Sequence, residues 1–191
     1  MRITIGIDNV IAASAVRLLD IYNNAYNQSR TLESFNPYDV EQTLGLDFQS
    51  TVSLFSKTWL DYRTIKTVDG TLSTIQTLSQ LRNLGQITLR SIGTNTILAQ
   101  IEAWLAFMKI PYDRFEPTVI DKITGSFTEL PAENTDVVID ANQKAAGKGA
   151  PLLLRRQPWN YTTVKSQSVT PINTLKDAVP IVRRLSWSFG R

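Results

Sequence analysis

The sequence predicts an α/β protein with a doubly wound, mostly parallel sheet and a small helical insertion. Three observations support this prediction. Short apolar runs alternate with amphipathic helical stretches of about ten or more residues, which implies parallel strands joined by right-handed crossovers. The chain has 191 residues, enough for one domain with its own core. Polar residues follow three of the expected strands, at the edge where ligands bind in such sheets.

The N-terminal part of the chain predicts one strand followed by helices. Residues 2–10 begin as an apolar strand and end in a polar turn. Residues 12–26 carry apolar side chains at helical spacing, and so do residues 40–60, where we expect a break near Gly45. The polar stretch 27–40 between them predicts a loop.

The rest of the chain alternates between expected helices and strands. In order, we expect a helix at 71–84 closed by Gly85, a strand at 87–91, a helix at 96–108, an inner strand at 136–140, a short helical connection at 141–149, a strand at 151–154, a mobile loop at 161–174 and a short helix at 174–179. The run at 136–140 is almost wholly apolar, as in strands covered on both faces.

Composition excludes several classes of chemistry. The sequence has no cysteine and no histidine, so a thiol nucleophile, an imidazole base and a zinc site built on those ligands are all excluded. No apolar run approaches the roughly 18 residues that a membrane span needs, and the N-terminus lacks the pattern of a secretory signal. We therefore expect a cytoplasmic protein with no membrane partner.

Charge is distributed unevenly along the chain. Residues 1–141 hold 11 Lys and Arg against 16 Asp and Glu, whereas residues 142–191 hold 9 against Asp177 alone. Such a basic C-terminal region attracts phosphates, nucleic acid or an acidic protein, or forms a solvated surface balanced by the acidic remainder. Its candidate contacts are Arg155, Arg156, Arg183 and Arg184.

Several short motifs occur in a defined order. Residues 6–10 read Gly-Ile-Asp-Asn-Val, Ser91 ends a strand, and residues 139–141 read Ile-Asp-Ala; the segments 100–115, 157–160 and 182–187 add further similarity. In this order the motifs resemble the haloacid dehalogenase superfamily of phosphatases, specifically its 5′(3′)-deoxyribonucleotidase-like branch. The resemblance covers nearly the whole chain. It implies a Rossmannoid core at 1–11 and 69–191, with a helical cap at 12–68.

The resemblance also implies roles for individual residues. In this superfamily the first Asp of the opening motif attacks phosphorus, and the second acts as acid and base. By position, Asp8 is the acid/base residue, Ser91 the phosphate-binding hydroxyl and Lys122 the phosphate-binding lysine. Asp8 and Asp140 are the implied ligands of Mg²⁺, the cofactor of the family.

Three departures from the pattern argue against retained phosphatase chemistry. Gly6 stands at the nucleophile position, Ala141 replaces a carboxylate of the fourth motif, and Gly93 stands where the branch often has Arg. With so few carboxylates left, Mg²⁺ is expected to bind weakly at best. We therefore expect a catalytically defective pseudoenzyme that binds a nucleotide, a phosphate or a macromolecular partner.

Two other functions stay open at this point. One is a weak Mg²⁺-dependent nucleotide phosphomonoesterase in which Asp8 or an activated water attacks phosphorus. The other is an interaction module that binds nucleic acid or an acidic protein through the basic C-terminal region. The site residues also have structural interpretations: Asp8 or Ser91 as a helix cap, and Asp140 as a turn residue.

Overall fold

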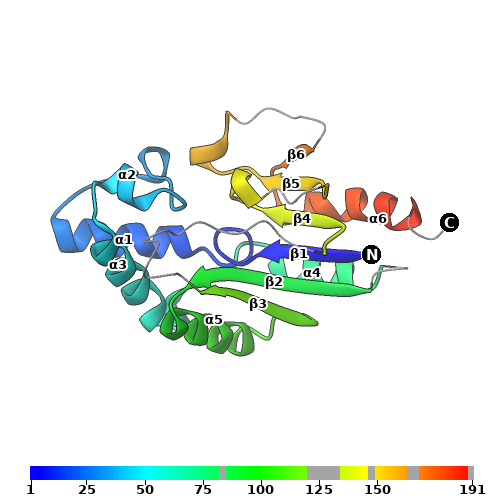
Figure 1. Cartoon of the computed structure of the whole chain (residues 1–191), viewed down its shortest axis with the longest axis horizontal. Coiled ribbons are helices and arrows are strands. Elements are labelled where there is room, and N and C mark those ends of the chain that lie inside the picture. The colour runs from blue at the N-terminus through cyan, green and yellow to red at the C-terminus, as the bar shows by residue number, and fades with distance from the viewer. Residues whose placement is uncertain (82–84, 120–133, 146–148, 163–167, 189–191) are drawn as a thin grey trace.

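The chain forms one six-stranded, wholly parallel sheet (Figure 1). This computed structural model describes residues 1–81, 85–119, 134–145, 149–162 and 168–188. The strand order is β3-β2-β1-β4-β5-β6. The strands are β1 (Arg2–Gly6), β2 (Gln86–Gly93), β3 (Arg114–Val119), β4 (Val137–Asp140), β5 (Leu152–Arg155) and β6 (Val169–Ile172). The predicted fold class is confirmed.

One face of the sheet carries the main apolar core. Side chains alternate between the two faces of a strand, so every second residue of the central strands points to this face. These residues are fully or almost fully buried: Ile3, Ile5, Ile87, Leu89, Val137, Ile139 and Leu153. Helices α4 (Thr71–Ser79), α5 (Asn95–Phe107) and α6 (Ala178–Ser188) pack their apolar faces into the same cluster.

Three further helices lie beyond the carboxyl ends of the strands (Figure 1). They are α1 (Ser14–Tyr26), α2 (Val40–Leu44) and α3 (Phe48–Leu60), and Gly45 separates the last two with φ +67°, where the sequence predicted a break. Leu18, Phe35 and Leu54 belong to a second apolar cluster that ties this segment together.

The segments that enter and leave this helical region run side by side. Ala12 and Thr67 form an antiparallel bridge, and the N–H of Ala13 donates to the carbonyl of Lys66 at 2.9 Å. The N–H of Val68 donates to the carbonyl of Ile11 at the same distance. This paired connection, residues 11–13 with residues 66–68, is called the hinge below. That residues 12–68 act as a cap stays a prediction.

Two predicted helices have different lengths in the structure. The helix expected at 71–84 ends at Ser79, with Gln80 as its C-cap, so Gly85 does not close it. Gly85 instead donates its N–H to the carbonyl of Met1 at 2.8 Å, which places it at the start of β2. The helix expected at 174–179 continues to Ser188 in α6, because Pro180 lies in the first turn, where proline is tolerated.

The predicted loop at 161–174 contains a strand. Residues 169–172 form β6, an edge strand that pairs only with β5 within the described chain. Its Pro171 and its lack of apolar alternation hide it from sequence analysis, since an edge strand tolerates proline and half-exposed side chains. Residues 163–167, also in that predicted loop, lie outside the described residues.

The expected connection at 141–149 is described only in part, as the short 3₁₀ helix at Gln143–Ala145. Among the described residues, no helix is both long enough and apolar enough to cross a bilayer.

Candidate functional site

Asp8 and Ser91 meet at the carboxyl edge of the sheet. The Ser91 hydroxyl, at the end of β2, donates to Asp8 Oδ2 at 2.5 Å. The Ser14 hydroxyl, in the first turn of α1, donates to Asp8 Oδ1 at 2.7 Å. The Ser14 hydroxyl also lies 3.4 Å from Asn9 Oδ1. Each oxygen of Asp8 thus accepts a hydrogen bond from one serine, and together these bonds orient the carboxylate.

Asp8 and Ser91 were considered as helix caps, but the backbone N–H groups at the starts of α1 and α5 are accepted by Asn9 and Thr94 instead. Asn9 adopts φ +61°, and its Oδ1 accepts the N–H of Ala15 at 2.8 Å at the start of α1. Thr94 is the N-cap of α5, and its hydroxyl accepts the N–H of Ile97 at 3.4 Å. The Asp8 carboxylate therefore contacts the Ser91 hydroxyl and the Ser14 hydroxyl at the start of α1.

The Asp140 carboxylate lies against Gly6. Ile5 pairs with Ile139 in the parallel register, so Gly6 and Asp140 are the next neighbours across β1 and β4. A Cβ placed on Gly6 would lie 2.5 Å from Asp140 Oδ2 and 2.9 Å from its Cγ. Asp140 is only 1% exposed, and its Oδ1 accepts the N–H of Asn142 at 2.8 Å. The carboxylate thus fills the space that a side chain at position 6 would need.

A second departure from the phosphatase pattern, Gly93, is also a site of close packing. A Cβ on Gly93 would lie 2.7 Å from Cγ2 and 2.9 Å from Cβ of Ile97, so a larger residue there would require Ile97 to move. The third departure, Ala141, is buried, and its carbonyl accepts the Asn160 side-chain amide at 2.8 Å.

A small cavity lies beside Asp8. It measures about 30 Å³ and is lined by the turn after β1, by α1 and by Pro37, Tyr38 and Phe55. The Tyr38 hydroxyl donates to the carbonyl of Asp8 at 2.7 Å, which links residues 12–68 to the tip of β1. A volume of this size holds on the order of two water molecules, so this particular cavity is too small for a phosphate group.

The described donor groups do not fit a Mg²⁺ ion. Mg²⁺ takes about six oxygen ligands in near-octahedral geometry. Nowhere in the described part of the chain do three acidic side chains gather closely enough to hold a metal. The oxygens of Asp8 accept from two serines, and Asp140 packs against Gly6 while accepting from the backbone.

Arg155 was predicted as part of a basic surface, but it is half-buried beside the turn after β1. Its guanidinium donates to the carbonyl of Asn9, to which the Gln157 side chain also donates at 2.9 Å. Burial lowers the pKa of Arg155, and the charge interaction with Tyr38 opposes that shift.

The other predicted basic residues lie away from this turn or outside the description. The Arg156 guanidinium lies 4.9 Å from the centre of the Tyr161 ring, and Arg183 and Arg184 are exposed on α6. Lys122, the predicted phosphate lysine, lies outside the described residues.

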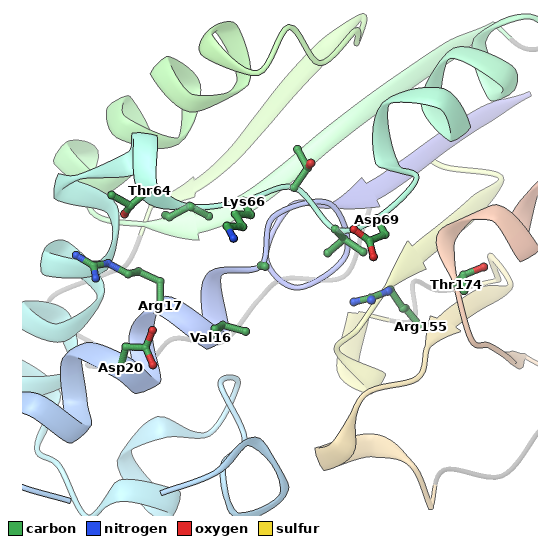
Figure 2. Close-up of a pocket in the computed structure, with 12 residues that line it drawn as sticks. Val16, Arg17, Asp20, Thr64, Lys66, Asp69, Arg155 and Thr174 are labelled. Carbon is green, nitrogen blue, oxygen red and sulfur yellow. The ribbon is translucent and has the colours of Figure 1, made fainter. Parts of the chain in front are cut away.

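A much larger cavity lies on the other side of the hinge (Figure 2). It measures about 650 Å³ and is bounded by the start of α1, residues 64–69, Arg155 and Thr174. Its cationic side chains are Arg17, Lys66 and Arg155. Sequence analysis missed Arg17 and Lys66, because they belong to no motif and only the pairing of the hinge brings them together.

Comparison with solved structures identifies the fold. L-2-haloacid dehalogenase from Xanthobacter autotrophicus, with chloropropionic acid covalently bound, matches with a TM-score of 0.56 and 11% identity, covering 95% of this chain and 98% of that chain. The HAD-hydrolase YfnB from Bacillus subtilis, bound to magnesium, matches with a TM-score of 0.55 and 13% identity, covering 95% and 97%. No protein-family model and no curated protein matches the sequence. The chain therefore has the haloacid dehalogenase-like hydrolase fold.

Proposed function

We propose that this chain is a haloacid dehalogenase-like protein that has lost phosphoryl-transfer chemistry and acts by binding. Its ligand is a nucleotide, another phosphate-bearing molecule or a macromolecular partner. The observation that carries the proposal is the position of the Asp140 carboxylate, which occupies the space over Gly6 where an attacking side chain would lie. The serine hydrogen bonds to both oxygens of Asp8 support it further, because they orient this carboxylate toward its own neighbours.

The resemblance to the 5′(3′)-deoxyribonucleotidase-like branch supports a phosphate-bearing ligand. Binding proteins often keep the scaffold of an enzyme while the reactive groups are lost, since function lies in the site rather than in the fold. Here the scaffold is retained over the whole described sheet. The excess of Lys and Arg over residues 142–191 favours an anionic partner.

The test is a phosphate-release assay with nucleoside monophosphates and millimolar Mg²⁺. We expect the purified chain to release no more phosphate than buffer does, with a haloacid dehalogenase-like phosphatase as positive control. The matched variants are Asp8→Asn and Asp20→Asn, because Asp20 is an exposed carboxylate on α1 away from Asp8. Turnover that Asp8→Asn abolishes and Asp20→Asn retains would refute the proposal and establish the weak phosphomonoesterase instead.

A further inference from the structure

Helix α6 carries an exposed face that no part of the described chain covers. The residues of this face recur at helical spacing, and all are exposed: Pro180, Arg183, Arg184 and Trp187. The opposite face of the helix is buried in the main core. Figure 1 shows α6 at the end of the molecule opposite to α1 and α3, away from the tip of β1. We call these four residues the α6 face.

Arg183 and Arg184 have no evident role in stabilising the helix. Within the described chain, neither takes part in an ion pair or a cation–π contact. The positions three and four residues away from each of them carry no carboxylate, so the charge pairs that stabilise helix surfaces are not formed. The helix dipole acts within the last turn, and the last turn of α6 holds no basic residue. The two cations are therefore open to an external partner.

Trp187 differs from the other tryptophans of the chain in its exposure. Trp59 and Trp104 are buried and pack edge-to-face at 5.9 Å, and Trp159 is half-buried. Trp187 is 70% exposed, although tryptophan is on average a highly buried residue. Within the described chain no ring contact and no cation–π contact involves it. Its ring is therefore open to stacking by a ligand.

The neighbouring helix α4 adds no opposing charge. Helices α4 and α6 contact each other and pack into the same core cluster. The exposed side chains of α4 are uncharged: Leu72, Ser73, Gln76 and Ser79. The two helices thus form a cationic surface bordered by neutral hydroxyl and amide groups. Such a surface attracts an anionic partner.

The composition of the α6 face favours single-stranded nucleic acid over an acidic protein. A protein interface has an apolar core, whereas the α6 face offers one aromatic ring among cations and neutral polar groups. Proteins that bind single strands combine these same two elements, an aromatic ring on which a base stacks and cations that follow the phosphates. In a single strand the bases are free to stack on a side chain, which paired bases are not.

We propose that the α6 face binds single-stranded nucleic acid, with a base stacked on Trp187 and the flanking phosphates on Arg183 and Arg184. This inference deepens the proposed binding function by naming a macromolecular partner. It rests on that function but not on the loss of phosphoryl transfer. Arg155 and Arg156 contact other parts of the molecule and do not belong to the α6 face.

The test is a titration of the full chain with oligo(dT) and oligo(rU) of about 15 nucleotides. Fluorescence anisotropy of the labelled strand gives the affinity, and unlabelled strand gives the change in intrinsic tryptophan emission. At about 50 mM salt we expect binding that weakens steeply as salt is added. We also expect partial quenching of the emission, because Trp187 is the tryptophan exposed to stacking.

Variants of the α6 face separate stacking from charge. Trp187→Ala should remove the quenching and weaken binding about fivefold or more, because one stacked base is lost. Arg183→Gln and Arg184→Gln should each weaken binding and each lower the slope of log affinity against log salt by about 0.7, the value for one phosphate contact to a single strand.

Matched controls lie outside α6. Arg30→Gln removes the same charge from an exposed position, and Tyr161→Ala removes a ring that is 67% exposed. Both should change the affinity less than about twofold. Circular dichroism checks that every variant is folded.

Four outcomes would overturn the inference. They are absence of binding by both oligonucleotides at low salt, equal affinity for a duplex of the same length, equal affinities of the α6 variants and the controls, and preferential binding of poly-glutamate. The last outcome would identify the α6 face as a site for an acidic protein.

The two proposals fail in distinguishable ways. Phosphate release from nucleoside monophosphates that persists in the α6 variants would contradict the loss of chemistry and leave the α6 face unaffected. Failure of the oligonucleotides to bind, without phosphate release, would contradict the α6 face alone, since the proposed function also includes small phosphate-bearing ligands.

Discussion

At the scale of single residues, Gly6 and Asp140 decide what the carboxyl edge of the sheet can do. Glycine at position 6 leaves room that the Asp140 carboxylate occupies from the neighbouring strand. An aspartate at position 6 would therefore compete with Asp140 for one buried volume. Gly6 and Asp140 form a closely packed pair.

The pair is tested by a double-mutant cycle. Gly6→Ala should reduce the free energy of unfolding by about 1–3 kcal/mol, because a Cβ there meets the buried Asp140 side chain. The cost should shrink when Asp140→Ala removes that side chain, and urea unfolding measures both values. Gly85→Ala is the control, since a Cβ there lies at an ordinary 3.6 Å from the Met1 carbonyl oxygen. Equal costs for Gly6→Ala in both backgrounds would show that the two residues do not compete for space.

At the scale of elements, the contacts between the helical region and the sheet determine how that region lies over Asp8. Tyr38 donates to the Asp8 carbonyl, and its ring lies 6.4 Å from that of Trp159 in an edge-to-face arrangement. These contacts come from the loop before α2 and from the segment after β5. They hold residues 12–68 against the turn after β1 in addition to the hinge.

Tyr38→Phe should lower the free energy of unfolding by about 1 kcal/mol, because it removes one hydrogen bond and keeps the ring. Tyr26→Phe is the matched control, since Tyr26 is 47% exposed at the end of α1. Urea unfolding of both variants gives the comparison. If the two substitutions have the same effect, the contact with Asp8 contributes nothing to stability.

The N-cap at the start of α3 makes a pH-dependent contribution to the stability of the folded protein. Asp47 is the N-cap, and hydrogen bonds from the backbone N–H and the hydroxyl of Ser50 lower its pKa. A lowered pKa in the folded state stabilises the protein above the unfolded pKa, and this contribution is lost as the pH falls through the folded pKa. Thermal unfolding between pH 7 and pH 2 should therefore show a smaller acid-induced decrease in Tm for Asp47→Asn than for the wild type. If Tm falls equally in Asp47→Asn and in the wild type, the lowered pKa of Asp47 does not contribute to stability.

At the scale of the whole molecule, the chain has the haloacid dehalogenase-like fold, and the Asp140 carboxylate lies against Gly6 at the carboxyl edge of its sheet. The sheet order and the helical region match hydrolases of that fold over 95% of this chain. Of the two cavities described above, the larger is lined by Arg17, Lys66 and Arg155 and the smaller lies beside Asp8.

Magnesium should not stabilise this protein. A ligand that binds only the folded state raises Tm by mass action, so millimolar MgCl₂ should change Tm by less than about 1 °C if the carboxylates hold no ion. CaCl₂ at equal ionic strength is the control for general salt effects. A magnesium-specific rise in Tm that disappears in Asp8→Asn would show that the tip of β1 still binds the metal.

The spacing of apolar residues predicted many of the helices and strands, but only those whose buried face shows up as a regular pattern along the sequence. Apolar spacing predicted the inner strand at 137–140 and the helices α1, α3 and α5. Burial of one helix face repeats apolar residues about every 3.6 positions, and burial of a strand on both faces gives a continuous apolar run. The edge strand β6 escaped prediction because its residues are half-exposed and include Pro171. Arg155 was recognised as basic, but its inward orientation depends on Asn9, which is distant in the sequence.

The sequence by itself determined the α/β class, the order of the main elements, the absence of cysteine and histidine chemistry and the presence of glycine at position 6. Only the tertiary structure decided that Asp140 fills the space over Gly6, that Ser14 and Ser91 hold Asp8, and that Arg17, Lys66 and Arg155 line one groove. The physical reason is that periodicity and residue identity are local properties. Strand register and the packing of distant side chains arise only when folding brings distant segments of the chain into contact.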